Sequence, residues 1–411
     1  MTWGGFVTCP CSTSHAAGHA LEPSISWHFH RTLLTIPGGP DSVAAIMFQP
    51  AFQITPAIAK ALMEVEASRQ AVARLPLTVA MLNSLRKTAR LLSTHYSTQI
   101  EGNRLSPSQV EQVLAGGGKF PGRERDEIEV RNYYRAVEFV ESLVDDSKPL
   151  TDRLIRTIHG LVMSGKKKPT AYRDGQNVIR DSGSGSGRII YLPPEAHDVP
   201  PLMAELVAWI ARQIKANELP MPLIAGLAHY QFATIHPYYD GNGRTARLLT
   251  TLILHRGGYG LRGIYSLEEY YAQNLPGYYD ALSVGKSHNY YMGRADADVT
   301  GFLIYFCDGL ADSFSKVRSQ AERAGRKKAF DQAPQLRSLT PQQRTALSLF
   351  VKTKTVTSSD VAAFFQITSR SAAALCKRWL AEKFFVIANP SKKARRYQLA
   401  DEYDSLIENV K

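Results

Sequence analysis

The sequence predicts a mainly helical protein with more than one domain and a single short β-hairpin inside its helical part. Apolar residues recur at helical spacing through most of the 411-residue chain. Two β-branched pairs, Val178-Ile179 and Ile189-Ile190, flank a Gly-Ser stretch, as in a hairpin. A length of 411 residues favours two or three domains.

The composition indicates an ordinary globular protein. The hydrophobic fraction is 44% and the charged fraction 21%, which allows sizeable cores. No apolar run is long enough to span a bilayer, so we expect no membrane partner. The first twenty residues lack the basic start and continuous apolar segment of a signal peptide. Four cysteines are too few for a disulfide framework and favour a reducing, cytoplasmic location.

Residues 1–46 differ from the rest, because they are rich in Gly, Pro, Ser and His and show no sustained period. We expect a disordered or non-native leader, with Met1 and Met47 both open as the native start. The cysteines and histidines of this leader are Cys9, Cys11, His15 and His19. Their spacing is not that of a common zinc site, so no metal site is predicted there.

An N-terminal helical region is predicted at 47–120. Thr55 is placed to cap a helix that has Pro56 at its first position. The next helix carries apolar residues at helical spacing and ends near Gly102-Asn103. A capping box at Ser106–Gln109 begins a third helix.

A helical core is predicted at 121–315, with helices at about 124–145, 150–164, 198–216 and 220–235. The hairpin at 178–191 interrupts them. A polar, basic linker helix at 316–338 follows, and a further domain at 339–411 begins with a capping box at Thr340–Gln343. Its three helices, at about 341–352, 358–365 and 369–383, precede two β-like segments at 384–389 and 395–400. This order is that of a winged helix-turn-helix.

One string, His236 to Arg247, combines groups that suit an anionic ligand. Gly241 and Gly243 remove side chains where backbone must approach a ligand, and glycine tolerates positive φ. They lie at the entry to a helix, where free N–H groups and the helix dipole favour an anion. Arg244 and Arg247 are three residues apart on that helix and can both bind phosphate oxygens.

The same string offers a metal ligand and a base. Asp240 supplies one hard carboxylate, which suits Mg²⁺ shared with a nucleotide. His236 is the nearby group that can accept a proton near neutral pH. A Gly-Asn-Gly turn or a histidine at a helix end is, taken alone, more often structural. In this order the parts favour phosphoryl-type transfer, in which positioning and charge stabilisation dominate.

The string HPYYDGNGRTAR resembles the signature of the Fic (filamentation induced by cAMP) family, His-x-Phe-x-(Asp/Glu)-Gly-Asn-Gly-Arg-x-x-Arg. The phenylalanine is replaced by Tyr238, which keeps the ring and adds a hydroxyl, so we expect its packing to be kept. The wider resemblance covers about 47–291. It includes IHGLVM at 158–163, AYRDGQNVIR at 171–180 and YYDAL at 278–282.

The resemblance implies an enzyme that transfers the AMP part of a nucleoside triphosphate, most often ATP, to a Tyr, Thr or Ser hydroxyl of a protein. On that resemblance His236 would deprotonate the hydroxyl, and Asp240 would hold Mg²⁺ against the α- and β-phosphates. Asn242, with the backbone of Gly241 and Gly243, would stabilise the α-phosphate. Arg244 and Arg247 would bind the leaving pyrophosphate.

Further residues resemble parts of that family's site. The hairpin resembles a flap that docks the target segment by strand addition. Its edge would be Arg188, Ile189, Ile190 and Tyr191. Tyr278 and Tyr279 resemble a pair that lines the adenine side, although a packed core pair is an equally open interpretation. Lys286 stands where some relatives carry an asparagine near the nucleotide, so the choice of base stays open.

The string STQIEG, Ser97 to Gly102, resembles the family's inhibitory motif, (Ser/Thr)-x-x-x-Glu-(Gly/Asn). Ser97 and Glu101 are four residues apart and share a helical face. The resemblance implies that Glu101 pairs with Arg247 and competes with the ATP γ-phosphate. The alternative is a surface charge at a helix end.

The chain's net charge is +12, and 335–400 carries twelve Lys and Arg against Asp360 and Glu382, a net +10. The residues predicted to contact nucleic acid are Arg370, Lys377, Arg378, Lys392, Lys393, Arg395 and Arg396. Such charges bind DNA phosphates without reading sequence. A basic winged helix that docks protein or forms a homodimer is the alternative. Two functions therefore stand: an autoinhibited AMP transferase, and a DNA-binding regulator whose Fic-like part senses a nucleotide.

Overall fold

The computed structural model describes residues 47–75, 77, 79–143, 149–180, 189–328, 338–351, 353–389, 391 and 395–408. The chain divides into two units, 1–43 and 44–411, and all the described residues belong to the second. The predicted leader, with Cys9, Cys11, His15 and His19, lies outside the described residues.

The N-terminal helices begin where the capping residues predict. Helix α1, Pro56–Arg74, starts with the Ile58 N–H donating to the Thr55 hydroxyl over 3.3 Å. Helix α2 spans Val79–Ile100. Helix α3, Pro107–Leu114, has both bonds of the predicted capping box between Ser106 and Gln109.

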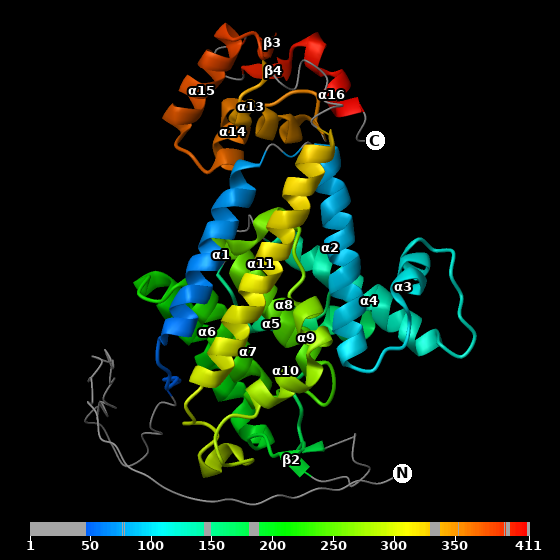
Figure 1. Ribbon diagram of the computed structural model, residues 1–411, viewed down its shortest axis with the longest axis vertical. Coiled ribbons are helices and arrows are strands. Elements are labelled where there is room, and N and C mark those ends of the chain that lie inside the picture. Colours follow the sequence, from blue (N-terminus) through cyan, green and yellow to red (C-terminus); the bar gives the residue numbers. More distant parts are fainter. Residues whose placement is uncertain are drawn as a thin grey trace, which may run out of the picture. The chain divides into compact units, whose positions relative to one another are not determined.

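The central part is built from helices α4 to α11 (Figure 1). Their bounds are α4 Glu124–Ser142, α5 Asp152–Ser164, α6 Val199–Ala216, α7 Met221–Ile235, α8 Asn242–Leu254, α9 Glu268–Gln273, α10 Leu275–Leu282 and α11 Thr300–Lys328. A π-helical turn at His255–Tyr259 follows α8. Helix α1 packs along α11, α7 packs against α6 and α8, and α4 packs against α5. None of the helices in the described segments is long and apolar enough to cross a membrane.

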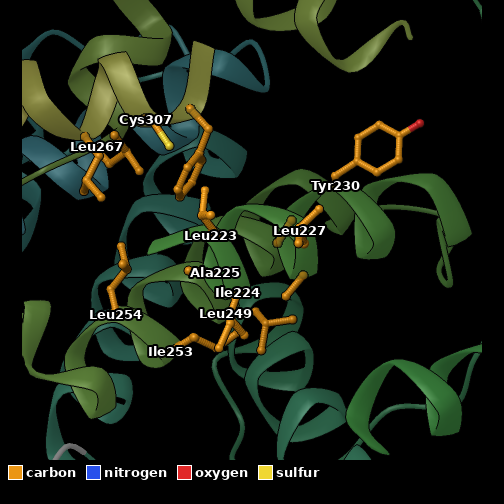
Figure 2. Close-up of a cluster of buried hydrophobic side chains, with 14 of the residues drawn as sticks. Leu223, Ile224, Ala225, Leu227, Tyr230, Leu249, Ile253, Leu254, Leu267 and Cys307 are labelled. Carbon is orange, nitrogen blue, oxygen red and sulfur yellow. The ribbon is translucent and has the colours of Figure 1, made fainter. Parts of the chain in front are cut away.

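The main core surrounds α7, which is buried on almost every side because α6, α8 and α11 all contact it. Figure 2 shows part of this cluster, including Leu223 and Leu227 of α7 with Leu249 and Ile253 of α8. Since α7 and α8 are both held in the core, the short loop that joins them, 236–241, has two fixed ends.

Two predicted domain boundaries do not separate cores. Ile58 and Val65 of α1 share one cluster with residues of α6 to α8, so the region 47–120 and the core at 121–315 form one packed body. The boundary predicted between 315 and 316 falls inside α11. Val317 and Ala321, predicted as linker, are buried in the same cluster. An apolar face of α11 continues to Ala321, but the charged residues around it make the sequence of this stretch look polar throughout.

The predicted hairpin is present but short. Strand β1 is Ile179–Arg180 and β2 is Ile189–Tyr191, paired antiparallel with an irregular register. The turn residues, with Arg188, lie outside the described residues. The chain after β2 bonds to a second loop, because the Leu192 N–H donates to the His288 carbonyl over 2.7 Å.

The C-terminal part follows the predicted order of three helical segments and a two-stranded sheet. Its elements are α13 Pro341–Ala346 with a 3₁₀ turn at Leu347–Phe350, α14 Ser358–Phe365, α15 Ser369–Ala381, β3 Phe385–Asn389, β4 Arg396–Leu399 and the short α16 Ser405–Glu408. An extra bridge joins Val356 to Tyr397 of β4. Trp379, Phe384 and Phe385 are fully buried in a cluster of their own. The first helix is shorter than the predicted 341–352, since its last turn is 3₁₀.

Candidate active site

The loop between α7 and α8 has a left-handed residue at each end. His236, at φ 51° and ψ 60°, ends α7, and Gly241, at φ 77°, begins α8. The Asn242 side chain closes the loop, since its amide oxygen accepts from the Tyr238 N–H over 3.0 Å and its amide nitrogen donates to the Tyr238 carbonyl over 2.7 Å. The Asn242 side chain therefore shapes the loop that an α-phosphate would meet.

Gly241 is required for conformation and for space. Its φ of 77° is costly for other residues, and a Cβ there would stand 2.6 Å from the sulfur of the flexible Met163 side chain and 3.2 Å from His159 Nε2, which hydrogen bonds hold in place. We expect Gly241→Ala to lower the free energy of unfolding by about 2 kcal/mol or more. Gly293→Ala is the matched control, because Gly293 has φ 106° with no atom within 4 Å of its Cβ position. Chemical denaturation of both variants should show the larger loss for Gly241→Ala; equal losses would show that the contact with Met163 is unimportant.

His236 is held as a neutral base. Its Nδ1 lies 3.4 Å from the Ala233 carbonyl oxygen, an acceptor that favours the proton on Nδ1 and leaves Nε2 able to accept one. Burial lowers the pKa of His236 to about 4, against the weaker opposing effect of that carbonyl contact. At neutral pH the imidazole is therefore uncharged.

His159 of α5 supports the other side of the loop. Its ring stacks on the Tyr238 ring, with centroids 3.5 Å apart and planes 7° apart. Its Nε2 lies 2.9 Å from the Asp240 carbonyl oxygen and its Nδ1 2.7 Å from the Thr170 hydroxyl. The ring packing expected of Tyr238 is thus present. His159 belongs to the IHGLVM segment, and the sequence alone assigns this histidine no role.

Arg244, on the first turn of α8, is buried between two carboxylates. One guanidinium nitrogen bonds to the Glu129 carboxylate of α4 and the other to Asp240 Oδ1 over 2.9 Å. Asn103 donates to the second Glu129 oxygen over 2.9 Å. Burial raises the pKa of the Glu129 carboxyl, against the charge of Arg244. Sequence reasoning missed Glu129, since it lies 115 residues from Arg244 and belongs to no motif.

Asp240 fits a shared magnesium ligand. Its side chain is 50% exposed and its Oδ1 accepts from the Gly241 N–H over 2.6 Å, while no hydrogen bond to Oδ2 is found among the described residues. Mg²⁺ bound with a nucleotide typically uses one or two carboxylates, phosphate oxygens and water. Within the described segments no group of three or more His, Cys, Asp or Glu forms a metal cage. Asp240 therefore offers one exposed carboxylate oxygen at the start of α8.

Arg247, one turn further along α8, bonds to residues at the end of α2. Its Nε donates to the Ser97 hydroxyl over 2.8 Å, and one Nη donates to the Ser97 carbonyl over 2.9 Å and to Glu101 Oε1 over 2.8 Å. The Arg247 side chain is 1% exposed and that of Glu101 25%. Burial alone would lower the pKa of Arg247, but the charge of Glu101 raises it. The expected contact between Glu101 and Arg247 is present.

Glu101 also covers the start of α8. A Cβ added to Gly243 would lie 2.4 Å from Glu101 Oε1 and 3.1 Å from an Arg247 nitrogen. The carboxylate thus lies against the backbone of the first helical turn, where N–H groups point outward and favour anions. An anionic group could bind at the position of the Glu101 carboxylate only after Glu101 has moved away.

The two tyrosines of α10 have different surroundings. Tyr278 is buried, stacks on Tyr271 and hydrogen bonds through its hydroxyl to His229 Nε2 over 2.8 Å. Tyr279 is half-exposed, and its hydroxyl donates to the Ile100 carbonyl over 3.4 Å, next to Glu101. Tyr278 is therefore a packed core residue, whereas the Tyr279 ring is open to solvent beside Glu101. Lys286 is exposed in the loop that follows.

The hairpin exposes part of its predicted edge. Ile189 and Ile190 are 44% and 42% exposed, unusual for adjacent isoleucines. Tyr191 is buried, and its hydroxyl donates to the Thr234 carbonyl of α7 over 2.7 Å. The Tyr191 side chain thus anchors the hairpin to α7. Of Tyr191, only the backbone remains available for docking.

The C-terminal candidates are exposed where they are described: Arg370, Lys377, Arg378, Arg395 and Arg396. Arg378 bonds to Gln342 over 3.0 Å, and Arg396 bonds to Thr355 over 3.3 Å. Lys392 and Lys393 lie outside the described residues. Arg370 and Lys377 are seven residues apart on α15 and so lie on one face of it.

Comparison with known proteins finds similarity to one family of domains in the part of the chain that holds loop 236–241 and α8. Residues 149–254 match the model of the Fic/DOC family, a range that includes α5, the hairpin and α8. Proteins named protein adenylyltransferase Fic are similar: that of Drosophila grimshawi is 29% identical over 199 residues, covering 48% of this chain and 40% of the relative. That of Drosophila erecta is 29% identical over 195 residues, 47% of this chain and 38% of the relative. The chain thus spans about two fifths of the length of these relatives.

Two solved structures have a similar fold. A Fic family protein from Desulfovibrio desulfuricans superposes with a TM-score of 0.52 at 24% identity, covering 86% of this chain and 99% of that one. A Fic domain containing signaling protein from Bacteroides thetaiotaomicron superposes with a TM-score of 0.53 at 22% identity, covering 66% of this chain and 97% of that one. These likenesses concern the helical fold.

Proposed function

We propose that this chain is an autoinhibited protein adenylyltransferase, which transfers AMP from ATP to a hydroxyl side chain of a protein. The observation that carries the proposal is the convergence of one neutral histidine, one exposed carboxylate and two buried arginines on the first turns of α8. His236, Asp240, Arg244 and Arg247 all come from one loop and one helix that the core holds in place. The names of the similar Drosophila proteins support the same activity.

The proposed reaction uses each of these groups once. The target hydroxyl oxygen attacks the α-phosphorus of ATP, and His236 Nε2 takes its proton. The bond from the α-phosphorus to the oxygen bridging to the β-phosphate breaks, and pyrophosphate leaves with the charge that Arg244 and Arg247 neutralise. The first-turn N–H groups beside Asn242 face the α-phosphate. Mg²⁺ held by Asp240 would neutralise charge on the phosphates.

Inhibition follows from the ion pair at Arg247. Glu101 and the ATP γ-phosphate are both anions, and the Arg247 side chain that would bind either of them is 1% exposed and already paired with Glu101. ATP that enters while Glu101 is in place would bind with its triphosphate displaced, so its α-phosphate would not face His236. AMP transfer would be slow until Glu101, at the end of α2, moves away from Arg247.

The target would dock on the hairpin. Ile189 and Ile190 expose apolar side chains, and β2 is paired on one side by β1. An extended segment added along the other side would gain backbone hydrogen bonds. Its Ser, Thr or Tyr would then reach the loop at His236, which follows the end of α7 that Tyr191 contacts.

Mass spectrometry of cell protein tests the proposed activity. Cells expressing the Glu101→Gly chain should contain proteins with AMP on a Ser, Thr or Tyr hydroxyl, and cells expressing Glu101→Gly with His236→Ala should not. Identical protein modification in both cultures would overturn the proposal. It would then favour the second candidate, a DNA-binding regulator with a nucleotide-sensing domain.

We further propose that the C-terminal part is a winged helix-turn-helix that binds DNA backbone, supported by the exposed Arg370 and Lys377 on α15. Deleting 335–411 should abolish retention on duplex DNA and leave basal AMP transfer, since the catalytic groups end well before it. Arg370→Ala/Lys377→Ala should reduce the salt dependence of log K by about two. Lys215→Ala, an exposed change on α6, is the control. Binding that does not depend on salt, or none to any duplex, would favour protein docking instead.

A further inference from the structure

Arg173, just before the hairpin, is a buried arginine whose guanidinium donates to backbone carbonyls and not to a carboxylate. Its residue is 3% exposed, and no carboxylate of the described residues forms an ion pair with it. A buried guanidinium without a counter-ion is costly unless every hydrogen is satisfied by an acceptor. The hydrogen bonds of Arg173 must therefore offset the cost of burying its charge.

Those contacts join the loop of His236 to both ends of the hairpin. The Arg173 N–H donates to the Pro237 carbonyl over 3.0 Å, and its Nε donates to the His236 carbonyl over 3.0 Å. One Nη donates to the Gly175 carbonyl over 3.0 Å, and the other bonds to the Pro194 carbonyl. Gly175 precedes β1 and Pro194 follows β2, so one side chain holds the two stems of the hairpin and the base.

Two neighbouring amides repeat this pattern. Asn177 donates to the Tyr238 carbonyl over 3.2 Å, and Gln176 donates to the Pro193 carbonyl over 3.0 Å. Helix α7 ends at His236 in a left-handed conformation, which costs a non-glycine residue about 1 kcal/mol or more. A strained residue keeps its conformation only when its surroundings enforce it, and the His236 carbonyl is held by Arg173.

We infer that Arg173 is a positioning residue for AMP transfer: it fixes the backbone of His236 and ties the position of the base to the hairpin on which the target docks. This inference rests on the proposed function. Arg173 itself contacts neither the phosphates nor the attacking hydroxyl. A lysine at this position keeps the charge but, with one nitrogen, cannot reach carbonyls on both the loop and the hairpin stems.

The charge of Arg173 supplies a separate signature. The charged groups that face His236 are Arg173, Glu101 and Asp240: Arg173 lowers the pKa of His236, and the two acids raise it. Burial is the largest cause of the lowered pKa. Removing the guanidinium removes a positive charge and loosens the loop toward water, and both changes raise the pKa of His236.

The test uses the full chain in a Glu101→Gly background, with Arg173→Gln and Arg173→Lys. Arg294→Gln is the matched control, because Arg294 is also buried, at 7% exposed, and also donates to backbone carbonyls, those of Leu282 and Val284. Its guanidinium lies over the Tyr191 ring, so this variant also controls for loosening of the hairpin at Tyr191. Steady-state kinetics with ATP and NMR titration of the His236 imidazole are measured on each protein. Thermal unfolding of each glutamine variant is measured to check that it is folded.

For Arg173→Gln we expect kcat to fall by up to about 10²-fold with KM for ATP changed by less than about threefold. The His236 pKa should rise. Arg173→Lys should keep the low pKa and recover only part of kcat, and Arg294→Gln should change neither. If both glutamine variants give the same kcat and the same His236 pKa, the inference is overturned. If the background protein transfers no AMP, the proposed function fails, and the NMR titration alone decides for or against Arg173.

Discussion

Glu101→Gly should raise the rate of AMP transfer about 10- to 150-fold, the equivalent of the 1.5–3 kcal/mol typical of a hydrogen bond between charged groups. The carboxylate that now bonds Arg247 over 2.8 Å would be gone, so the ATP γ-phosphate could take its place. Label incorporation at equal ATP measures the change. Glu101→Gln is the matched variant, since it keeps the shape of the side chain and removes only the charge.

The partner of Glu101 can be tested in the same assay. Glu101→Gly combined with Arg247→Ala should be inactive again, because the released arginine is what the nucleotide needs. Without ATP, Glu101→Gly also leaves Arg247 buried with no anion, so ATP should raise the unfolding temperature of this variant more than that of the parent. An unchanged rate in Glu101→Gly would falsify the inhibitory role. An active double variant would show that Arg247 is not the shared partner.

His236→Ala should reduce transfer by about 10²- to 10⁴-fold, the usual contribution of a general base. ATP binding should persist, because the change removes no phosphate ligand. His197→Ala is the control, as His197 is an exposed histidine 74% accessible to solvent. Self-labelling of His236→Ala at the parent rate would show that another group takes the proton.

The pH dependence of the Glu101→Gly protein carries the same information. Only neutral His236 can accept a proton, and burial lowers its pKa to about 4. The rate should therefore be level through pH 6.5, where an ordinary histidine titrates, and fall only as pH approaches 4. A fall centred near pH 6.5 would mean that the imidazole is solvated in the working enzyme.

The sequence predicted those parts of the site that lie within a few residues of each other. Loop 236–241 and the arginines of α8 follow from local spacing, and the pairing of Glu101 with Arg247 followed from a resemblance. The residues that support the loop could not be found in this way. Arg173, His159 and Glu129 each contact the loop or α8 at a residue more than 60 positions away. Glu129 belongs to no motif, and the two segments that contain His159 and Arg173 resemble the family without showing what these side chains contact.

Burial was the other limit of the sequence analysis. Tyr278 and Tyr279 are adjacent on α10, so they point about 100° apart, and the spacing alone does not say which faces the core. Likewise, α11 continues past the predicted boundary at 315, because Val317 and Ala321 pack inward among basic and polar residues. A mostly polar helix can have one narrow apolar face. Which face is buried becomes clear only from the helix that packs against it, here α1.

The most direct test of AMP transfer compares two positions of label in ATP. The Glu101→Gly protein is incubated with Mg²⁺, a cell extract and ATP labelled either at the α- or at the γ-phosphate, with Glu101→Gly/His236→Ala as the control. Transfer of AMP predicts protein that retains the α label, loses the γ label as pyrophosphate and stays unlabelled in the control. Retention of the γ label would instead show phosphate transfer. No retained label from either position would contradict an adenylyltransferase.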